Sequence, residues 1–368
     1  MVRFSINKVI FLAQLIILLL VYIAYLSLIG YVFYTREIDL IESIWLISLG
    51  VFGIIWFSYL ILSIKKFKRH IRRLFVFNLN LIFNNRIFWA IIGSINKRTK
   101  FVKTIFLAYP ANNKFSKEYV FESILEETRW SPWVTGFFIQ NGKVGINFAI
   151  SSTEIDFRED VNLEQLRELW LRMNHLRNLL DAEQMTFAGI LPGIFYKKNI
   201  IHKLPIELDN TVNAVKDVVV AITDELNLSI KDTPIIVLGG KGFIGNKFID
   251  AMNESKVYCI DIKDENSYNI QDIMQKHKDE IIILNVASQK ALEENLIYFN
   301  ERVIIINEVY PEPDSEISQK ITNKGSQLFH VVGVEGKAFP RFPKAYKNGI
   351  PCCASWNSSK IKGKFIKI

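Results

Sequence analysis

Cysteine is scarce in this sequence, which has only three cysteines among its 368 residues, at positions 259, 352 and 353. Three cysteines cannot form a disulfide framework, and the adjacent pair Cys352 and Cys353 would make a poor structural bridge. A reducing cytoplasm therefore suits this chain.

Several motifs that identify a particular chemistry are also missing. The sequence has no C-x-x-C, no H-E-x-x-H and no P-loop pattern. Their absence argues against a structural zinc site and against a Walker ATPase. No clear Tyr-x-x-x-Lys, Ser-His-Asp or metal constellation takes their place.

Charged residues are absent from two N-terminal stretches, Val9 to Tyr34 and Ser43 to Ile64. Each reaches the roughly 20 residues that a helix needs to cross a bilayer. A signal peptide would have an apolar core of about 7–15 residues ending in small residues, whereas the first stretch is longer and ends in Tyr-Val-Phe-Tyr. We expect a two-helix transmembrane hairpin within residues 1–73.

The distribution of basic residues predicts the orientation of this hairpin. The connecting loop holds one arginine against three acids, whereas the second apolar stretch is followed by Lys65, Lys66, Lys68, Arg69, Arg72 and Arg73. Basic flanks remain on the cytoplasmic side, so both termini and the main domain should be cytoplasmic. The basic run should contact anionic lipid headgroups rather than nucleic acid. Residues 74–100 are expected to form an interfacial or connector helix.

A dinucleotide fingerprint is the most informative feature present. Gly240, Gly242 and Gly245 have G-x-G-x-x-G spacing after the apolar run 235–238, with Phe243 and Ile244 between the last two glycines. Gly240 would permit a tight turn, Gly242 would let the backbone approach a pyrophosphate, and Gly245 would let the following helix lie close to the strand. The phosphates would bind at the N-terminus of that helix.

An acidic residue stands where the fingerprint requires one. A second apolar strand, 256–260, ends at Asp261, about 20 residues beyond the first glycine, where an acid binds the ribose hydroxyls. The charge of Asp261 would repel a 2′-phosphate and therefore favours NAD. Lys263, two residues later, keeps NADP as the alternative. A glycine turn that binds nothing is the alternative interpretation.

The rest of the chain has an α/β pattern that predicts two domains. Residues 101–230 should form an α/β substrate-type domain, with a strand over 102–109, a hairpin around Asn141-Gly142, and helices over 162–181 and from Asp209 to about 226. Residues 231–368 should form a Rossmann-like doubly wound parallel sheet, with further strands over 281–287, 303–309 and 329–334. The polar ends of these strands should line a cleft.

Three residues are candidates for the reacting centre. Lys197 and His202 follow an expected strand and Pro-Gly turn over 187–193, and they could hold a substrate or supply a proton. Cys352 could be a nucleophile if a helix beginning there stabilised its thiolate. The alternatives are solvated surface residues and a small buried cysteine.

These features resemble the NAD(P)-binding Rossmann superfamily, in the branch where a substrate domain precedes the nucleotide domain, as in shikimate dehydrogenase and methylenetetrahydrofolate dehydrogenase. The chain is also similar to long-chain acyl-carrier-protein reductases, in which a Gly-containing apolar turn, the fingerprint and a late cysteine recur in this order, as Gly189 to Gly193, Gly240 to Gly245 and Cys352 with Ala354 do here. The Asn-Val-Thr-x-Pro-x-Lys motif of the shikimate family is absent, so its substrate cannot be transferred.

The sequence therefore predicts a membrane-anchored NAD(P)-dependent oxidoreductase that acts on a carbonyl, alcohol or acyl substrate at the cytoplasmic face. The substrate would be a small molecule or derived from lipid, and NAD would supply the redox chemistry. A non-catalytic NAD-binding sensor or scaffold tethered to the membrane is the alternative, and the missing catalytic constellation favours it.

Overall fold

The computed structural model describes residues 65–368 except 111–112, 263–267, 311, 343–345, 347–348 and 357–360, together with residues 27, 45, 48 and 51. Nearly all of the predicted transmembrane hairpin, and Lys263, lie outside the described residues. The chain divides into two compact units, Met1–Arg72 and Arg73–Ile368. The description below concerns the second unit.

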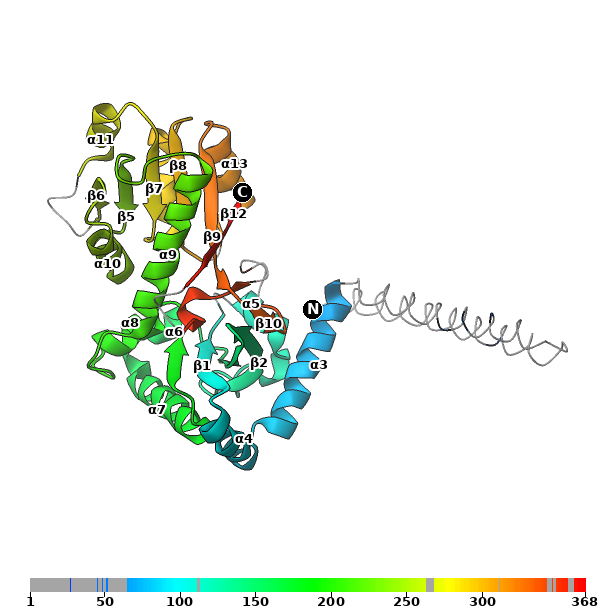
Figure 1. Cartoon of the computed structure of the whole chain (residues 1–368). Coiled ribbons are helices and arrows are strands. Elements are labelled where there is room, and N and C mark those ends of the chain that lie inside the picture. The colour runs from blue at the N-terminus through cyan, green and yellow to red at the C-terminus, as the bar shows by residue number, and fades with distance from the viewer. Residues whose placement is uncertain are drawn as a thin grey trace. The chain divides into compact units, whose positions relative to one another are not determined.

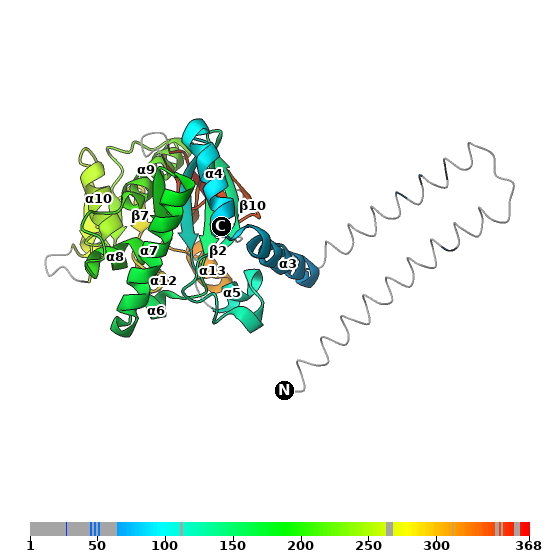
Figure 2. The ribbon, with the colours of Figure 1, turned by 90° about the horizontal axis from the view of Figure 1, so that it is seen from below.

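In the part of the chain that the structure describes, we find no single helix long and apolar enough to cross a membrane. Helices α3 (Lys65–Phe83) and α4 (Arg86–Thr99) reach that length and composition only as a pair, and they are bent by 81° at the break between them. Helix α4 packs against α7 (Leu163–Leu180), as Figure 2 shows. Gly93 permits this contact, because a Cβ there would lie 1.9 Å from the Leu179 carbonyl oxygen.

The first lobe is built on a five-stranded mixed sheet with the order β10-β2-β3-β1-β4. Strands β3, β1 and β4 are parallel, and β2 and β10 are antiparallel additions at one edge. The strands are β1 (Val102–Ala108), β2 (Trp133–Gln140), β3 (Lys143–Ala149), β4 (Gln184–Phe187) and β10 (Lys337–Phe339). Its short helices are α5 (Asn113–Tyr119), α6 (Glu154–Arg158) and α8 (Leu191–Lys197).

The second lobe has a parallel sheet with the order β9-β8-β7-β5-β6, to which β11 and β12 add antiparallel strands beside β9. The parallel strands are β5 (Ile235–Leu238), β6 (Val257–Ile260), β7 (Ile281–Asn285), β8 (Val303–Asn307) and β9 (Gln327–Glu335). The added strands are β11 (Gly349–Ile350) and β12 (Gly363–Lys367).

Helices cover both faces of this second sheet (Figure 1). Alternate residues of β5 face opposite ways, so that Ile235 and Val237 join one buried cluster and Ile236 and Leu238 join the other. Burial on both faces explains why these strands are continuously apolar in sequence. The helices are α9 (Ile206–Glu225) and α10 (Phe243–Ala251) on one face, and α11 (Ile270–Lys276), α12 (Gln289–Glu294) and α13 (Ser315–Thr322) on the other.

Strand order reverses at β5, because β6 and β7 lie on its two sides. In open α/β sheets ligands bind outside the carboxyl ends of the strands at such a switch point. The predicted doubly wound sheet and its mixed α/β class are confirmed.

The two lobes share one part of the hydrophobic core. Helix α9 packs against β4 of the first lobe and against α10 and β12 of the second (Figure 1). After β9 the chain crosses to the first sheet as β10 and then forms the short 3-10 helix η5 (Cys352–Ala354). Phe138, Val334 and Trp356 meet in the shared cluster.

Two expected local structures are wrong. The apolar run 187–193 is not a strand ending in a Pro-Gly turn, because β4 ends at Phe187 and Pro192 lies in the first turn of α8. Proline is tolerated in a first turn, where its missing N–H needs no partner. Helix α9 begins at Ile206 after Pro205 and not at Asp209, and no side chain caps it. Burial of Leu208 and Val212 extends the helix toward its N-terminus.

Candidate active site

A cavity of about 670 Å³ lies between the two lobes and is lined from both. The carboxyl-terminal ends of β1, β3 and β4 approach it from the first lobe, and those of β7 and β8 approach it from the second. Ile244 in the first turn of α10 also lines it. The cavity therefore reaches the switch point of the second sheet.

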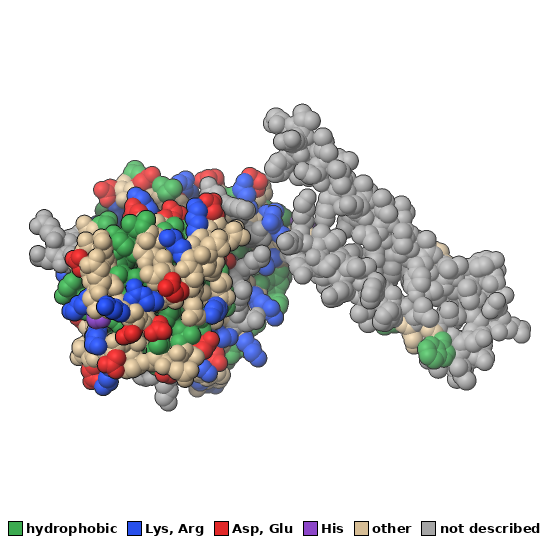
Figure 3. Space-filling view, turned by 90° about the horizontal axis from the view of Figure 1, so that it is seen from above, with side chains coloured by type: hydrophobic (Ala, Val, Ile, Leu, Met, Phe, Trp, Pro, Cys, Tyr) green, Lys and Arg blue, Asp and Glu red, His purple; other side chains and the backbone are tan. Residues whose placement is uncertain are grey.

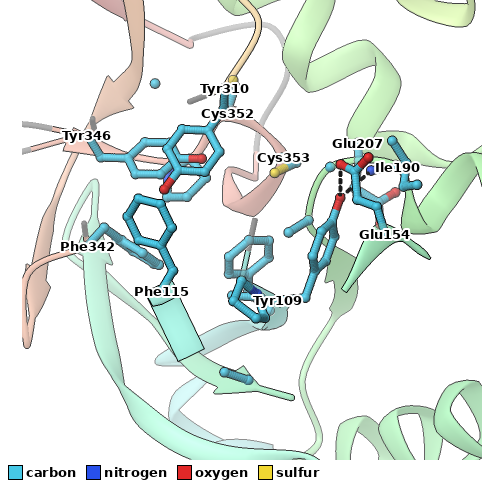
Figure 4. A pocket seen from close by; sticks show the side chains of 18 of the residues that line it. Tyr109, Phe115, Glu154, Ile190, Glu207, Tyr310, Phe342, Tyr346, Cys352 and Cys353 are labelled. Atoms are coloured by element: carbon cyan, nitrogen blue, oxygen red, sulfur yellow. Dashed lines mark hydrogen bonds between the residues drawn. The ribbon is translucent and has the colours of Figure 1, made fainter. Parts of the chain in front are cut away.

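Tyr109, directly after β1, is held by two hydrogen bonds at the wall of this cavity (Figure 4). Its hydroxyl donates to Glu154 Oε1 over 3.1 Å and accepts from the Ile190 backbone N–H over 2.9 Å. Burial and the neighbouring carboxylate raise the pKa of Tyr109 well above its usual value. The phenol is therefore neutral at physiological pH, and its one hydrogen is directed at Glu154.

The loop between β4 and α8 must contain a glycine to make this arrangement. Gly189 has φ +52°, and a Cβ there would lie 2.1 Å from the Tyr109 hydroxyl oxygen. A side chain would thus both strain the backbone and displace the tyrosine. The chain does turn at Gly189, but this turn leads into α8, and the predicted Pro-Gly turn at 192–193 does not form.

An aromatic group forms the opposite wall of the cavity (Figure 4). Tyr310 stacks on Tyr346 with ring centroids 5.5 Å apart, and Phe342 and Phe115 contact this pair at 5.8 Å and 6.3 Å. These residues come from distant parts of the chain and from both lobes. They make the wall suitable for an apolar part of a ligand.

Two glutamates in the cavity wall have raised pKa values. Burial raises the pKa of Glu207 to about 7, although the carboxylate also accepts a hydrogen bond from the Phe187 backbone N–H. Burial raises the pKa of Glu308, at the end of β8, to about 8. Glu308 is thus mainly protonated at neutral pH, and both acids are placed to exchange a proton near that pH.

The adjacent cysteines both line the cavity, and neither is an activated thiolate. No long helix begins at Cys352, because η5 has only three residues. Burial raises the pKa of Cys352 to about 12 and that of Cys353 well above its usual value. Figure 4 shows the Cys353 sulfur between the aromatic group and Tyr109.

Polar residues at the ends of β7 and β8 and within β9 form a buried network. Asn285 donates to the Asn307 side-chain oxygen over 2.7 Å, and Asn307 lies 3.1 Å from His330 Nδ1. Burial lowers the pKa of His330, so the ring stays neutral. His330, which lies within β9 rather than at its start, supports the carboxyl edge of the sheet through this network.

The fingerprint glycines form the turn from β5 into α10. The residue with a left-handed backbone in this turn is Gly239, with φ +87°. Gly240 instead allows close contact with Cys259, since its Cβ would lie 2.4 Å from that sulfur. Gly245 lets α10 approach the loop, because a Cβ would lie 2.3 Å from the Gly239 carbonyl oxygen.

Gly242 and Asp261 lie beside each other at the loop between β5 and α10. Gly242 is the N-cap of α10, and among the described residues a Cβ there would meet only the Gly239 carbonyl oxygen within 4 Å, so no described side chain fills this corner. Asp261 Oδ2 accepts a hydrogen bond from the Lys241 backbone N–H over 3.0 Å, which holds the carboxylate beside the glycine loop. Phe243 faces α8, with its ring 6.1 Å from that of Tyr196.

Of the residues predicted to react, the structure brings only Cys352 to the cavity. Lys197 is exposed at the end of α8, with its Nζ 5.4 Å from the Phe243 ring centroid, and His202 is exposed in the following loop. Neither is among the residues that line the cavity.

Sequence reasoning missed Tyr109, Glu154, Glu207 and Cys353, and it gave Glu308 and Tyr310 no catalytic role. Local signals existed for two of them, since Tyr109 and Glu308 each follow an apolar strand. Glu207 lies inside a helix and carries no such signal. Its role depends on which strands the fold brings beside that helix.

No protein-family model matches the chain, and no curated protein matches it in sequence. Its structure is similar to that of dipicolinate synthase from Bacillus halodurans, with 9% identity, a TM-score of 0.29, and coverage of 61% of this chain and 88% of that one. It is also similar to that of L-tryptophan dehydrogenase from Nostoc punctiforme, with 12% identity, a TM-score of 0.29, and coverage of 62% of this chain and 69% of that one.

A third similar structure is shikimate 5-dehydrogenase from Listeria monocytogenes in complex with shikimate and NAD, with 9% identity, a TM-score of 0.31, and coverage of 62% of this chain and 86% of that one. The sheet of the second lobe, with its parallel order β9-β8-β7-β5-β6, is of the Rossmann type that the sequence predicts. Similarities this low say nothing about the substrate.

Proposed function

We propose that this protein is an NAD(P)-dependent oxidoreductase that acts on a carbonyl, alcohol or acyl substrate and is anchored at the cytoplasmic face of a membrane. One observation carries the proposal: a single cavity extends from the first turn of α10 and the ends of β7 and β8 to Tyr109 in the other lobe. A nucleotide on the glycine loop and a substrate beside Tyr109 would share this space.

The glycine loop fits a nicotinamide dinucleotide. The open corner at Gly242, at the N-terminus of the nine-residue helix α10, suits a diphosphate. Asp261 beside the loop suits the ribose hydroxyls and favours NAD over NADP. A dinucleotide bound there would supply or accept the hydride.

Two residues of the cavity are suited to transfer the proton that accompanies the hydride. Reduction of a carbonyl to an alcohol needs a proton on the oxygen, and the reverse reaction must remove one. Glu308, with a pKa of about 8, is mainly protonated at neutral pH. Tyr109 is neutral, and its hydroxyl would have to turn away from Glu154 to donate to a substrate. We assign no covalent step to Cys352 or Cys353, because burial keeps both thiols protonated.

The lining of the cavity favours a substrate that is largely apolar. Aromatic rings form one wall, and protonation of Glu207 and Glu308 would leave few charges within it. A carbonyl or acyl group on a hydrophobic body fits these walls better than a small, highly charged acid.

Titration of the purified full chain with NAD, NADP and their reduced forms tests the nucleotide site. We expect Gly242→Val to weaken binding at least tenfold, because its side chain fills the corner meant for the diphosphate. Gly193→Ala is the control, since its Cβ would lie 3.4 Å from the Phe243 ring in ordinary contact. Unchanged binding in the Gly242 variant would refute the assignment.

Turnover separates an enzyme from a sensor. Hydride transfer should be measured with aldehydes, hydroxy acids and acyl thioesters, and Glu308→Gln should slow it because the variant has no proton to exchange. In the direction of carbonyl reduction, the parent rate should fall as pH rises through about 8, where Glu308 loses its proton. Tight NAD binding without turnover on any substrate would support the non-catalytic alternative.

The membrane anchor is part of the proposal and has its own test. The uncharged stretches Val9 to Tyr34 and Ser43 to Ile64, followed by the basic run that begins at Lys65, support a hairpin with both termini cytoplasmic. The full chain should stay in the membrane fraction after alkaline carbonate washing. Release into the supernatant would refute the anchor and leave the nucleotide site untouched.

A further inference from the structure

Helices α3 and α4 lie at the outside of the first lobe (Figure 2). Both expose several large apolar side chains. On α4 the exposed side chains recur every four residues, with Ile87 74% exposed and followed by Ile91 and Ile95. On α3 the most exposed is Leu81, at 72%. We call the whole set the apolar ridge; it comprises Leu74, Phe77, Leu81, Ile82, Ile87, Ile91 and Ile95.

The opposite faces of the same helices are fixed to the first lobe. Asn80 of α3 donates to the Val134 carbonyl oxygen and accepts from the Val134 N–H, over 2.7 Å and 2.8 Å. Asn96 of α4 donates to the carbonyl oxygens of Val102 and Leu180. The ridge is therefore the outer face of well-held helices, and it is not a consequence of poor packing.

Charge distinguishes this segment from the rest of the molecule. Residues 65–100 contain ten Lys and Arg and no Asp or Glu. Elsewhere acidic and basic side chains are interspersed, as the face in Figure 3 shows. Arg86, Lys97 and Arg98 lie at the two ends of α4 and are exposed, whereas Lys100 is ion-paired with Asp181. An apolar face with basic residues and without acids is typical of helices that lie in an anionic membrane interface.

We propose that the apolar ridge docks onto an anionic bilayer surface. The inference rests on the membrane anchoring proposed above and adds which face of the folded domain meets the lipid. The chain that precedes α3 ends in the uncharged stretch Ser43 to Ile64, so the ridge follows directly after the expected anchor. Lipid is thus the partner that both the charge and the chain order favour.

Docking would bring one wall of the cavity to the membrane. Phe77 of the ridge contacts Trp133, with ring centroids 6.5 Å apart, and Arg73 donates to the Lys117 carbonyl oxygen in α5. Trp133 and the α5 residues Phe115 and Tyr119 line the cavity. A substrate with an apolar body could then be supplied from the bilayer.

Depth-dependent fluorescence quenching tests the proposal on the full chain. An environment-sensitive fluorophore is attached to the new cysteine of the variants Ile87→Cys and Ile91→Cys. The matched control is Ile297→Cys in the second lobe, because Ile297 is as exposed as Ile87. The parent chain labelled in parallel corrects for the native cysteines. The vesicles contain phosphatidylcholine and phosphatidylglycerol, with phosphatidylcholine brominated on its acyl chains as the quencher.

We expect the probes on α4 to lose fluorescence about twofold with brominated lipid, whereas the probe at position 297 keeps its signal. Replacement of phosphatidylglycerol by phosphatidylcholine should reduce the quenching. Equal signals at all three positions would overturn the proposal. Protection from aqueous iodide without quenching by lipid would also overturn it, since a second copy or another protein would then cover the ridge.

These readouts separate docking from the other proposals. Carbonate extraction reports on the anchor and nucleotide titration on the redox site, whereas quenching reports on the ridge alone. If the chain stays in the membrane but the α4 probes are not quenched, the docking proposal fails and the anchor stands. Quenching in a chain that binds no nucleotide would leave docking in place and refute the oxidoreductase.

Discussion

The two lobes differ in the kind of sheet at their centre. The second lobe has a parallel sheet buried on both faces by helices, and its strands are continuous apolar runs. The first lobe has a mixed sheet whose last strand, β10, arrives from the far end of the chain. A lobe made of consecutive βα units can be predicted from sequence, whereas a lobe completed by a distant segment cannot.

The same difference separates the two halves of the candidate site. The half proposed to bind the nucleotide consists of one loop and one acid about 20 residues apart, within one βαβ unit. The reacting half is assembled from β1, α6, α9, the end of β8 and the segment around η5. Changes in the first half should therefore act locally, whereas changes in the second should affect both lobes.

The largest effect on stability is expected at Gly93, where α4 lies against the backbone of α7. Gly93→Val would place its side chain against the Leu179 carbonyl oxygen and should lower the free energy of unfolding by about 3 kcal/mol or more. The neighbouring Ser94 is exposed, so Ser94→Val should change stability by less than about 1 kcal/mol. Chemical denaturation of both variants in detergent is the measurement.

Gly245 is the counterpart of Gly93 in the second lobe, where a Cβ would meet the Gly239 carbonyl oxygen. Gly245→Val should lower the free energy of unfolding by a similar amount. If Gly245→Val unfolds the protein and Gly93→Val is tolerated, α4 is not part of the first lobe as described.

A pH-dependent effect is expected at Glu207, which links α9 to β4. Its folded pKa of about 7 lies above its usual 4.5, so the folded state binds the extra proton and the protein loses stability as pH rises between these values. Glu207→Gln keeps the acceptor oxygen without the charge. Above pH 8 it should be more stable than the parent by on the order of 3 kcal/mol, and at pH 5 nearly equal to it.

Thermal unfolding across this pH range checks the Glu207 prediction. Glu254→Gln is the control, because Glu254 is an exposed carboxylate paired with Lys231. It should show no gain in stability above pH 8. A gain of the same size in both variants would point to a change in net charge rather than to the buried acid.

A smaller effect is expected at the loop that positions Tyr109. Gly189→Ala should lower the free energy of unfolding by about 2 kcal/mol, because the backbone at this position is left-handed and the new Cβ would displace the Tyr109 hydroxyl. Turnover should fall more than nucleotide binding, since the loop belongs to the reacting half. Gly193→Ala, four residues along the chain in α8, should be neutral or slightly stabilising. Equal losses in the two variants would contradict this role for Gly189.

The smallest effects are expected at the two exposed residues that the sequence suggested as reacting groups. Lys197→Ala removes one exposed contact with the Phe243 ring, worth about 0.5–1 kcal/mol. His202→Ala removes a surface side chain. Turnover should change by less than about threefold in either variant. A hundredfold loss would show that the site includes the α8 loop, and our assignment of the cavity would then be incomplete.

Much of the fold follows from local patterns. The hairpin around Asn141-Gly142, the long helix α7 and the strands of the second sheet occur where the sequence predicts them. Each has a signal within ten to twenty residues, such as a turn dipeptide, a helical period or an apolar run between breakers. The errors at 187–193 and at the start of α9 arose where a proline or a cap suggested a boundary that burial overrode.

The sequence by itself determined the glycine loop, the acid that follows it and the apolar N-terminal stretches, because each depends on neighbours in the chain. Only the tertiary structure decided that Tyr109, Glu207, Glu308 and Cys353 line one cavity and that Lys197 and His202 lie outside it. The physical reason is that burial and long-range interactions set the position and pKa of these groups, and both depend on segments far apart in the chain, as between Tyr109 and Cys353.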